Sequence, residues 1–216
     1  MSDAVTDLPP DPLVAILAGG AGKRIGGAKF IRELAGRRLL DHALVIASRW
    51  SSDPLVVAAA AEGQAVSGLR AVVDRQGIAG PLGGIAAALD EALGTAADRL
   101  MILPVDMPFL PEDLMPQLAA ALDREPAAGC AIASVGGDRY PVCSLWRVER
   151  LAEALPGYAG SGGRSLRGLV ERLGGVAVEW SGTAARSAFF NINTAADLAA
   201  AERWLERGID LAGTPG

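Results

Sequence analysis

A glycine-rich stretch that follows a short apolar run constrains this chain more than any other feature. Residues 13–17 are Leu-Val-Ala-Ile-Leu, which predicts a buried strand. Glycine then occurs five times within residues 19–27, with Lys23, Arg24 and Lys29 among and after these glycines. Glycine lets backbone N–H groups turn inward and approach an anion closely, and the cations would neutralise its remaining charge. The stretch therefore predicts a triphosphate-binding loop at the end of a first strand.

This loop differs from two well-known phosphate-binding motifs. No Gly-Lys-Ser/Thr closes it, so it is not a Walker A loop, and the dinucleotide fingerprint G-x-G-x-x-G does not occur in it. An ordinary glycine-rich turn with solvated Lys and Arg side chains is the alternative interpretation.

The bulk composition restricts the class of partner. The chain has 216 residues, a formal net charge of −5 and a pI of about 5.0, which suits one domain and no nucleic-acid partner. No apolar run approaches the ~20 residues that cross a bilayer. The acidic segment Met1–Asp7 lacks the features of a signal peptide, and the two cysteines, Cys130 and Cys143, suit a reducing compartment. We therefore expect a cytoplasmic protein with no membrane partner.

Apolar periodicity and turn residues predict alternating strands and helices first, and a hairpin pattern later in the chain. Strands are predicted over residues 13–17, 55–60, 69–73, 100–105, 130–135, 139–146 and 176–180. Helices are predicted over residues 39–50, 82–93, 111–122, 148–155, 165–173 and 195–207, with a glycine-rich loop over 156–163. The last two helices begin with the N-cap residues Ser165 and Thr194. This order predicts an α/β fold with a doubly wound, mostly parallel, Rossmann-like sheet and a hairpin-type second half.

Two aspartates directly follow predicted strands. Asp74 comes after the strand over 69–73, and Asp106 after the strand over 100–105. Ligands of doubly wound sheets bind beyond the carboxyl ends of the strands. A carboxylate there suits Mg²⁺, which binds through one or two carboxylates plus substrate phosphates. A role in shaping turns is the alternative for both residues.

Four motifs, in this order, resemble those of the nucleotidyltransferases that load nucleotides onto small phosphorylated molecules, and in particular the molybdenum cofactor guanylyltransferases. The motifs are Leu17-Ala18-Gly19-Gly20 with Arg24 and Lys29, then Gly80-Pro81-Leu82-Gly83-Gly84, Leu103–Pro108 around Asp106, and Phe190-Asn191-Ile192-Asn193-Thr194. The resemblance implies one nucleotidyltransferase domain over residues 13–207, with a nucleotide-binding half over 13–125 and an acceptor half over 126–207. Residues 1–12 and 208–216 are then flexible tails.

The resemblance also implies which residues form the site. The nucleotide-binding residues would be Leu17, Ala18, Gly19, Gly20, Gly22, Lys29, Asp74, Gly80, Pro81, Gly83 and Asp106. Arg24, Lys29 and Asp106 would be catalytic, with Asp106 as the ligand of Mg²⁺. Tyr140, Pro141, Asn191 and Asn193 would bind the acceptor. Alternation along an extended segment would place the amides of Asn191 and Asn193 on one face.

The reaction implied is attack by the terminal phosphate of a molybdopterin-type cofactor on the α-phosphorus of GTP. Its products are the guanine dinucleotide cofactor and pyrophosphate. The attacking oxygen is already anionic, so catalysis needs positioning and charge neutralisation rather than a general base. Molybdoenzyme chaperones or apo-molybdoenzymes are the partners that would receive the product.

Features that bear on base choice point in two directions. Gly20 has no Cβ and so leaves room for a purine, and backbone groups of Leu17–Gly19 are expected to read the base. Residues 58–60 are all alanine and lack the Asn that the family often carries there, which speaks against guanine. Two other departures from the family pattern do not concern the base: Ile25 replaces the usual Met, and Ala28 replaces the usual Asp and leaves one fewer anion beside the metal. The alternatives are a cytidylyltransferase acting on the same cofactor, a sugar-phosphate nucleotidyltransferase, and a non-catalytic nucleotide- or cofactor-binding protein of the same fold.

Overall fold

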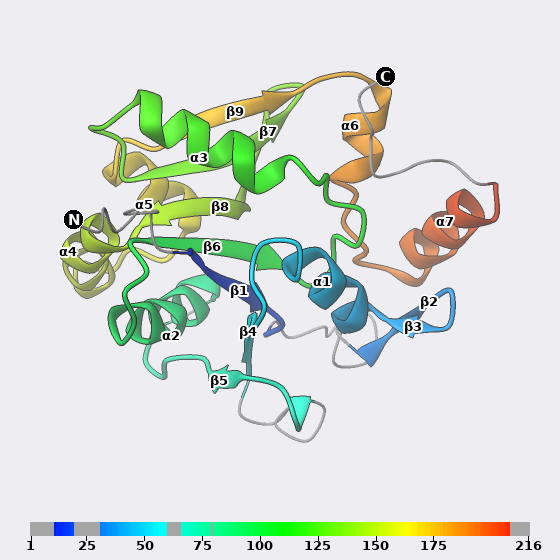
Figure 1. Ribbon diagram of the computed structural model, residues 1–216, viewed down its shortest axis with the longest axis horizontal. Helices are drawn as coiled ribbons and strands as arrows, with labels where there is room; N and C mark the ends of the chain where they lie inside the picture. Colours follow the sequence, from blue (N-terminus) through cyan, green and yellow to red (C-terminus); the bar gives the residue numbers. More distant parts are fainter. Residues whose placement is uncertain (1–10, 20–30, 60–65, 79, 208–216) are drawn as a thin grey trace, which may run out of the picture.

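The computed structural model describes residues 11–19, 31–59, 66–78 and 80–207. Within these residues, seven strands form one sheet in the order β5-β4-β1-β6-β8-β7-β9, and β2 and β3 form a separate pair (Figure 1). The strands are β1 (Leu13–Leu17), β2 (Glu33–Leu34), β3 (Arg37–Arg38), β4 (Leu55–Ala58), β5 (Ala71–Val73), β6 (Arg99–Pro104), β7 (Cys130–Val135), β8 (Asp138–Arg147) and β9 (Val176–Trp180). The helices are α1 (Leu39–Ala47), α2 (Pro81–Leu93), α3 (Leu114–Arg124), α4 (Val148–Gly160), α5 (Leu166–Arg172), α6 (Thr183–Ala188) and α7 (Ala195–Glu206).

The strands of the large sheet run parallel except for β8. β1 pairs in parallel with β4 and β6, β4 pairs with β5, and β7 pairs with β9. β8 is antiparallel to both β6 and β7. The carboxyl ends of the other six strands of this sheet therefore meet at one edge. The predicted α/β fold with a mostly parallel sheet is confirmed, and the predicted hairpin of β7 and β8 continues that same sheet.

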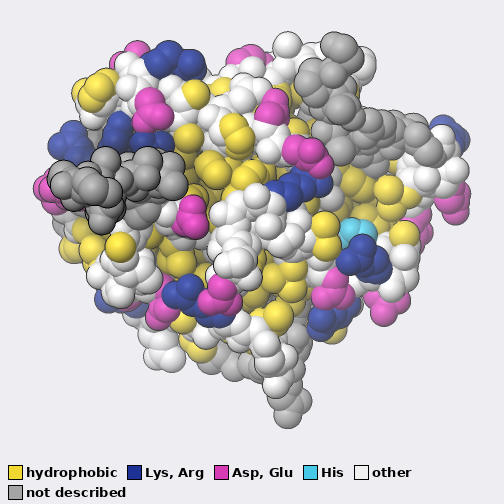
Figure 2. Space-filling model, in the orientation of Figure 1, with side chains coloured by type: hydrophobic (Ala, Val, Ile, Leu, Met, Phe, Trp, Pro, Cys, Tyr) yellow, Lys and Arg dark blue, Asp and Glu magenta, His cyan; other side chains and the backbone are white. Residues whose placement is uncertain are grey.

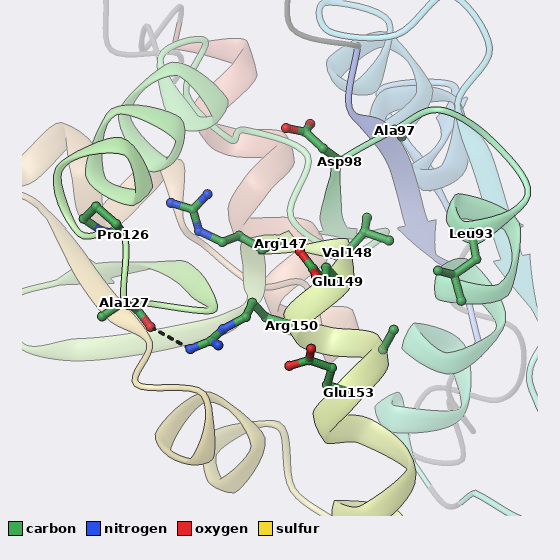
Figure 3. Close-up of a pocket in the computed structure, with 11 residues that line it drawn as sticks. Leu93, Ala97, Asp98, Pro126, Ala127, Arg147, Val148, Glu149, Arg150 and Glu153 are labelled. Atoms are coloured by element: carbon green, nitrogen blue, oxygen red, sulfur yellow. Dashed lines mark hydrogen bonds between the residues drawn. The ribbon is translucent and has the colours of Figure 1, made fainter.

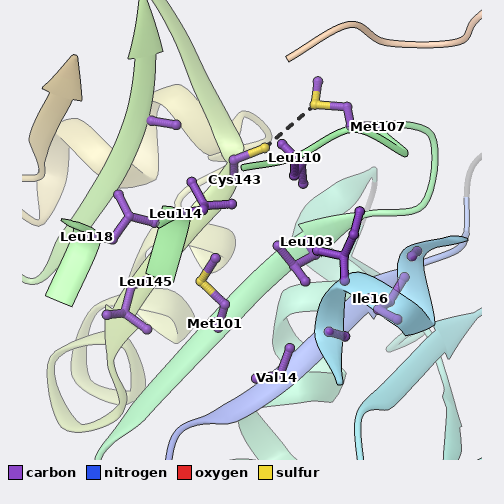
Figure 4. Close-up of a cluster of buried hydrophobic side chains, with 14 of the residues drawn as sticks. Val14, Ile16, Met101, Leu103, Met107, Leu110, Leu114, Leu118, Cys143 and Leu145 are labelled. Atoms are coloured by element: carbon purple, nitrogen blue, oxygen red, sulfur yellow. Dashed lines mark hydrogen bonds between the residues drawn. The ribbon is translucent and has the colours of Figure 1, made fainter. Parts of the chain in front are cut away.

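Helices cover both faces of the sheet (Figure 1). Val14 and Ile16 belong to a buried cluster with residues of α1 and α3, part of which is drawn in Figure 4. Leu13 and Ala15 belong to a second cluster with residues of α2, α4 and α5. Successive residues of a strand point to opposite faces, so β1 is buried on both sides. This explains why residues 13–17 form a continuous apolar run instead of an alternating one.

Two helices of the second half differ from the prediction. α4 continues to Gly160 and includes Pro156, where the sequence predicts a loop over 156–163. Leu151 and Leu155 of this helix are buried, so packing outweighs the hydrogen bond that Pro156 cannot donate. α6 has no counterpart in the prediction, because its six residues are too few to display a helical period.

Other boundaries move by a few residues, and both predicted N-caps are confirmed. α1 ends at Ala47 instead of residue 50, and α3 begins at Leu114 instead of residue 111. The Ser165 hydroxyl accepts a hydrogen bond from Gly168 N–H, and Thr194 forms a capping box with Asp197. Such caps fix where a helix begins, so these two starts could be predicted from sequence.

The visible surface carries charges of both signs. On the face shown in Figure 2, Lys and Arg side chains lie among Asp and Glu side chains, and no large field of one sign is visible among the described residues there. None of the described helices is long and apolar enough to cross a bilayer.

A buried polar pair on β8 provides a test of the core. Trp146 and Ser144 are both 0% exposed, and the Trp146 indole N–H donates to Ser144 Oγ at 2.7 Å. Ser144→Ala would leave the indole N–H without this partner, so we expect the free energy of unfolding to fall by about 1–3 kcal/mol in urea denaturation. Ser48→Ala, which removes an exposed hydroxyl, should change it by less than about 0.5 kcal/mol. Equal stability of the two variants would contradict a role for this pair.

Candidate functional site

Main-chain hydrogen bonds continue beyond the strand ends at the carboxyl edge of the sheet. Ala18 N–H and Gly19 N–H both donate to Val57 O, at 2.8 and 3.2 Å. Asp74 N–H donates to Ala58 O at 3.1 Å, one strand further along. The ends of β1, β4 and β5 are therefore held in fixed register, which brings Gly19 beside Asp74.

The Asp74 carboxylate lies against bare backbone at two glycines. A Cβ placed on Gly19 would lie 2.8 Å from Asp74 Oδ2, and one placed on Gly84 would lie 3.2 Å from Asp74 Oδ1 and 2.9 Å from Leu17 Cδ2. The absence of a side chain at both glycines thus leaves space for the carboxylate, and a larger residue at either position would collide with it. Burial raises the pKa of Asp74 above its ordinary range. Gly84 is absent from the residues predicted for the site, although it is the last glycine of the motif over 80–84.

The loop after β5 and the start of α2 pack closely beside Asp74. Gly80 is the N-cap of α2 with φ of +68°, a conformation that favours glycine, and Pro81 occupies the first turn. Arg75 N–H donates to Gly83 O at 3.1 Å, and a Cβ on Gly83 would lie 2.7 Å from Ile78 O. The predicted residues Gly80, Pro81 and Gly83 thus form a compact turn at the same edge as Asp74.

Asp106 lies two residues beyond the end of β6, which neighbours β1 in the sheet. Val105 N–H donates to Leu17 O at 3.2 Å, and Ile192 N–H donates to Asp106 O at 2.9 Å. The first bond joins the Asp106 turn to β1, and the second joins it to the segment over 190–194. Asp106 itself is half-buried. The structure therefore brings the predicted metal ligand next to a predicted acceptor segment 86 residues further along the chain.

A divalent cation at Asp106 would depend on the substrate for most of its ligands. No group of three or more His, Cys, Asp or Glu side chains able to hold a metal occurs in the described part of the chain. Mg²⁺ often binds through one carboxylate plus phosphate oxygens and waters. A single half-buried carboxylate at a strand end fits that mode and does not fit a metal site built from protein groups alone.

The predicted acceptor residues surround a bulge in β8. Ile132 of β7 pairs with Ser144, but Ala133 pairs with Tyr140, so the residues between them on β8 are left out of the ladder. Bulges of this kind redirect side chains and are frequent near active sites. The half-buried Tyr140 ring packs on Phe189 with centroids 5.2 Å apart. Tyr140 and Pro141 are thereby set beside the segment that begins at Phe189.

Asn191 and Asn193 differ in their surroundings. Asn191 Oδ1 is buried and has no hydrogen-bond partner in the described structure. Asn193 is exposed, and its N–H donates to Asp197 Oδ2 at 2.9 Å as part of the cap of α7. Ile192 between them is 1% exposed and anchors the segment in a small cluster with Leu34 and Phe109. Of the two amides, Asn191 is the one left with an unused buried acceptor.

Four of the predicted site residues lie outside the described residues: Gly20, Gly22, Arg24 and Lys29.

A hollow lies at the opposite edge of the sheet, away from Asp74 and Asp106. It has a volume of about 1120 Å³ and is lined by side chains that include Leu93, Asp98, Arg147 and Glu153 (Figure 3). Arg147 is already engaged, because its guanidinium donates to Ala128 O and Leu122 O at 3.1 and 2.7 Å. The predicted functional residues in the described structure all lie at the other edge, where the strands of the parallel set end.

Carboxylates that follow two parallel strands, β5 and β6, on either side of a strand that leads into a glycine-rich stretch, define a nucleotide-binding α/β protein. Comparison with known proteins narrows this class. The chain belongs to the family with the MobA-like NTP transferase domain, whose model matches residues 14–176.

Curated relatives cover nearly the whole chain. A molybdenum cofactor guanylyltransferase of Bradyrhizobium sp. (strain ORS 278) is 38% identical over 194 residues, which is 87% of this chain and 90% of that protein. One of Cereibacter sphaeroides (strain ATCC 17029 / ATH 2.4.9) is 36% identical over 193 residues, with 89% and 96% covered.

Solved structures share the fold. The molybdopterin-guanine dinucleotide biosynthesis protein A of Archaeoglobus fulgidus has a TM-score of 0.71 at 24% identity, with 90% of this chain and 98% of that chain covered. The 2-C-methyl-D-erythritol 4-phosphate cytidylyltransferase of Thermus thermophilus has a TM-score of 0.64 at 21% identity, with 90% and 99% covered. At these identities the likeness concerns the fold.

The raised pKa of Asp74 has a consequence for stability. A carboxyl whose pKa is higher in the folded than in the unfolded chain penalises folding once it is ionised, and the penalty disappears below the unfolded value. Asp74→Asn should therefore raise the melting temperature at pH 7, and the gain should shrink as the pH falls toward the ordinary value of 3.8. Glu153→Gln, at an exposed position of α4, is the control and should show neither effect. A gain that is independent of pH would contradict the explanation.

Proposed function

We propose that this protein transfers GMP from GTP to the terminal phosphate of molybdopterin, giving the guanine dinucleotide cofactor and pyrophosphate. The observation that carries the proposal is that Asp74 and Asp106 lie at the same edge of the sheet, on either side of the strand that leads into the glycine-rich stretch, with the segment over 190–194 bonded to Asp106. The relatives that share 36–38% of their residues with the chain are named molybdenum cofactor guanylyltransferases.

The proposed catalysis combines positioning with charge neutralisation. The attacking phosphate oxygen is anionic, so no side chain needs to remove a proton from it. Asp106 would hold Mg²⁺, which supplies positive charge to the triphosphate where negative charge develops. Arg24 and Lys29 would neutralise the remaining charge from the loop side. Divalent cations are general in this family, and Mg²⁺ is the ion that we propose.

Base reading is proposed to rest on the Asp74 carboxylate. The sequence predicts backbone groups of Leu17–Gly19 in this role, but Ala18 N–H and Gly19 N–H already donate to Val57 O. Asp74, held against Gly19, accepts hydrogen bonds only, when ionised. Guanine presents an N–H and an exocyclic amino group on one edge, which are two donors for one carboxylate. Cytosine lacks this pair of adjacent donors.

The acceptor is proposed to lie between the β8 bulge and the last loop. The Tyr140 ring offers an aromatic face, and Asn191 Oδ1 offers a buried acceptor for an N–H group of the pterin. Pro141 and Asn193 would complete this side. The division into a nucleotide-binding half over 13–125 and an acceptor half over 126–207, and delivery of the product to molybdoenzymes or their chaperones, belong to the same proposal.

Nucleotide preference tests the function directly. With molybdopterin as acceptor, GTP should be used over CTP by at least about tenfold in kcat/KM, which corresponds to ~1.4 kcal/mol. The reason is that a site built to hydrogen-bond one base leaves its own polar groups unpaired with another. Product analysis by chromatography with each nucleotide measures the preference. Equal use of the two nucleotides would favour a cytidylyltransferase, and no turnover with either would favour a binding protein.

Asp106→Asn tests the proposed metal ligand. Loss of a charged ligand should reduce turnover on the order of 10³-fold while the melting temperature changes little, because Asp106 is half-buried at a loop. Steady-state kinetics at saturating Mg²⁺ and a thermal unfolding curve provide the two measurements. Asp123→Asn removes an exposed carboxylate that pairs with Arg99 at 2.6 Å, and it should keep its activity. Full activity of Asp106→Asn would show that Asp106 only shapes the turn and does not bind the metal.

A further inference from the structure

One buried thiol lies in the bulge of β8 and contacts the loop that carries Asp106. The pairing of β8 with β6 ends at Ser144 and Ile102, and β8 rejoins β7 only at Tyr140. Cys143 lies within the unpaired stretch and is 0% exposed. Its side chain belongs to the same buried cluster as Leu145, two residues further along β8.

Cys143 contacts the residue that follows Asp106. Its thiol donates to Met107 Sδ at 3.6 Å, and the Met107 side chain is itself only 2% exposed (Figure 4). Both side chains belong to the buried cluster that also contains Val105 and Leu110. Atoms in such a core are close-packed, so removing one sulfur leaves space into which a neighbour shifts. The neighbour in this case is the side chain attached to the Asp106 turn.

Two main-chain hydrogen bonds also hold the Asp106 turn, and neither comes from β8. Val105 N–H donates to Leu17 O of β1, and Ile192 N–H donates to Asp106 O. The contact between Cys143 and Met107 adds a link from this turn to the bulge with Tyr140 and Pro141. The contact therefore joins the nucleotide side of the proposed site, which carries Asp106, to the acceptor side, which carries Tyr140 and Pro141.

We propose that Cys143 is a positioning residue, which sets the place of the Asp106 carboxylate relative to the acceptor segment over 140–142. The inference rests on the proposed function, because it takes Asp106 as the metal ligand. A thiol at this position acts through size and packing more than through its weak hydrogen bond. A displacement of about 1 Å at a reacting group can reduce the rate on the order of 10²-fold, so a small shift of Met107 is enough to matter.

Cys130 provides a matched control. It is also a free and fully buried cysteine, but it lies at the amino end of β7 and belongs to the cluster on the other face of the sheet. A Cβ on Gly175 would lie 2.6 Å from its Sγ, which places this thiol against the turn before β9. Cys130→Ala therefore deletes a core sulfur without touching the Asp106 turn.

The test compares Cys143→Ala with Cys130→Ala in two measurements. The first is kcat for GMP transfer, and the second is Mn²⁺ affinity in the presence of GTP, titrated by electron paramagnetic resonance without the acceptor. Cys143→Ala should reduce kcat about tenfold and weaken Mn²⁺ binding severalfold, while Cys130→Ala should stay within about twofold of the wild type in both. Both variants should lose some thermal stability, so a loss of stability does not distinguish a positioning role from a purely structural one.

Equal behaviour of the two variants in kcat and Mn²⁺ affinity would overturn the inference. If Cys143→Ala does not fold, Cys143→Ser replaces it, because the shorter C–O bond withdraws the donor from Met107 while keeping a polar group. Asp106→Asn separates this inference from the proposed function. Loss of Mn²⁺ binding in Asp106→Asn with normal Cys143→Ala leaves the function standing and overturns the inference. Normal Mn²⁺ binding in Asp106→Asn removes Asp106 as the metal ligand and overturns the inference, whereas turnover by the wild type tests the function itself.

Discussion

The hydrogen bonds that β1 makes beyond its own end determine the geometry of the candidate site. Val57 O of β4 accepts hydrogen bonds from Ala18 N–H and Gly19 N–H. On the other side of β1, Leu17 O accepts one from Val105 N–H. β1 is thus fixed between β4 and β6 at the point where the chain leaves the sheet. Asp74 and Asp106 lie on either side of that point because the strands that precede them are held in the same register. The position of both carboxylates therefore depends on how β1 is held between β4 and β6.

Much of this arrangement could be predicted from sequence because its signals are local. Residues 13–17 form an apolar run because β1 is buried on both faces, and Asp74 and Asp106 could be recognised because each follows a short apolar strand. Ser165 and Thr194 are recognisable as caps because a cap depends on residues three positions away. The family resemblance extends the same information to residues 80–84 and 190–194.

The features that could not be predicted depend on contacts between distant segments. No residue near Pro156 in the sequence indicates that α4 continues past this proline because Leu151 and Leu155 are buried. Ala18 N–H and Gly19 N–H, to which the sequence assigns base reading, already donate hydrogen bonds to Val57 O. These bonds join residues 38 to 39 positions apart. Pro141 is the one local sign of the bulge between Ser144 and Tyr140, because proline inside a sheet is confined to edges, strand starts and bulges, but it does not determine which residues leave the ladder. Arg24 and Lys29 remain predictions outside the described residues.

The bond between Ile192 and Asp106 has a consequence for how the protein is made. Residue 192 leaves the ribosome long after residue 106, yet it holds the main chain of that earlier residue. The sheet order adds to this delay, because β6 lies between β1 and β8, and β9 joins only beside β7. Chain closure over such separations is slow compared with local helix formation. A nascent chain that has completed β6 and the turn after it therefore contains both carboxylates but not the complete site. The site is complete only when the segment around Ile192 has been synthesised and has bound to Asp106.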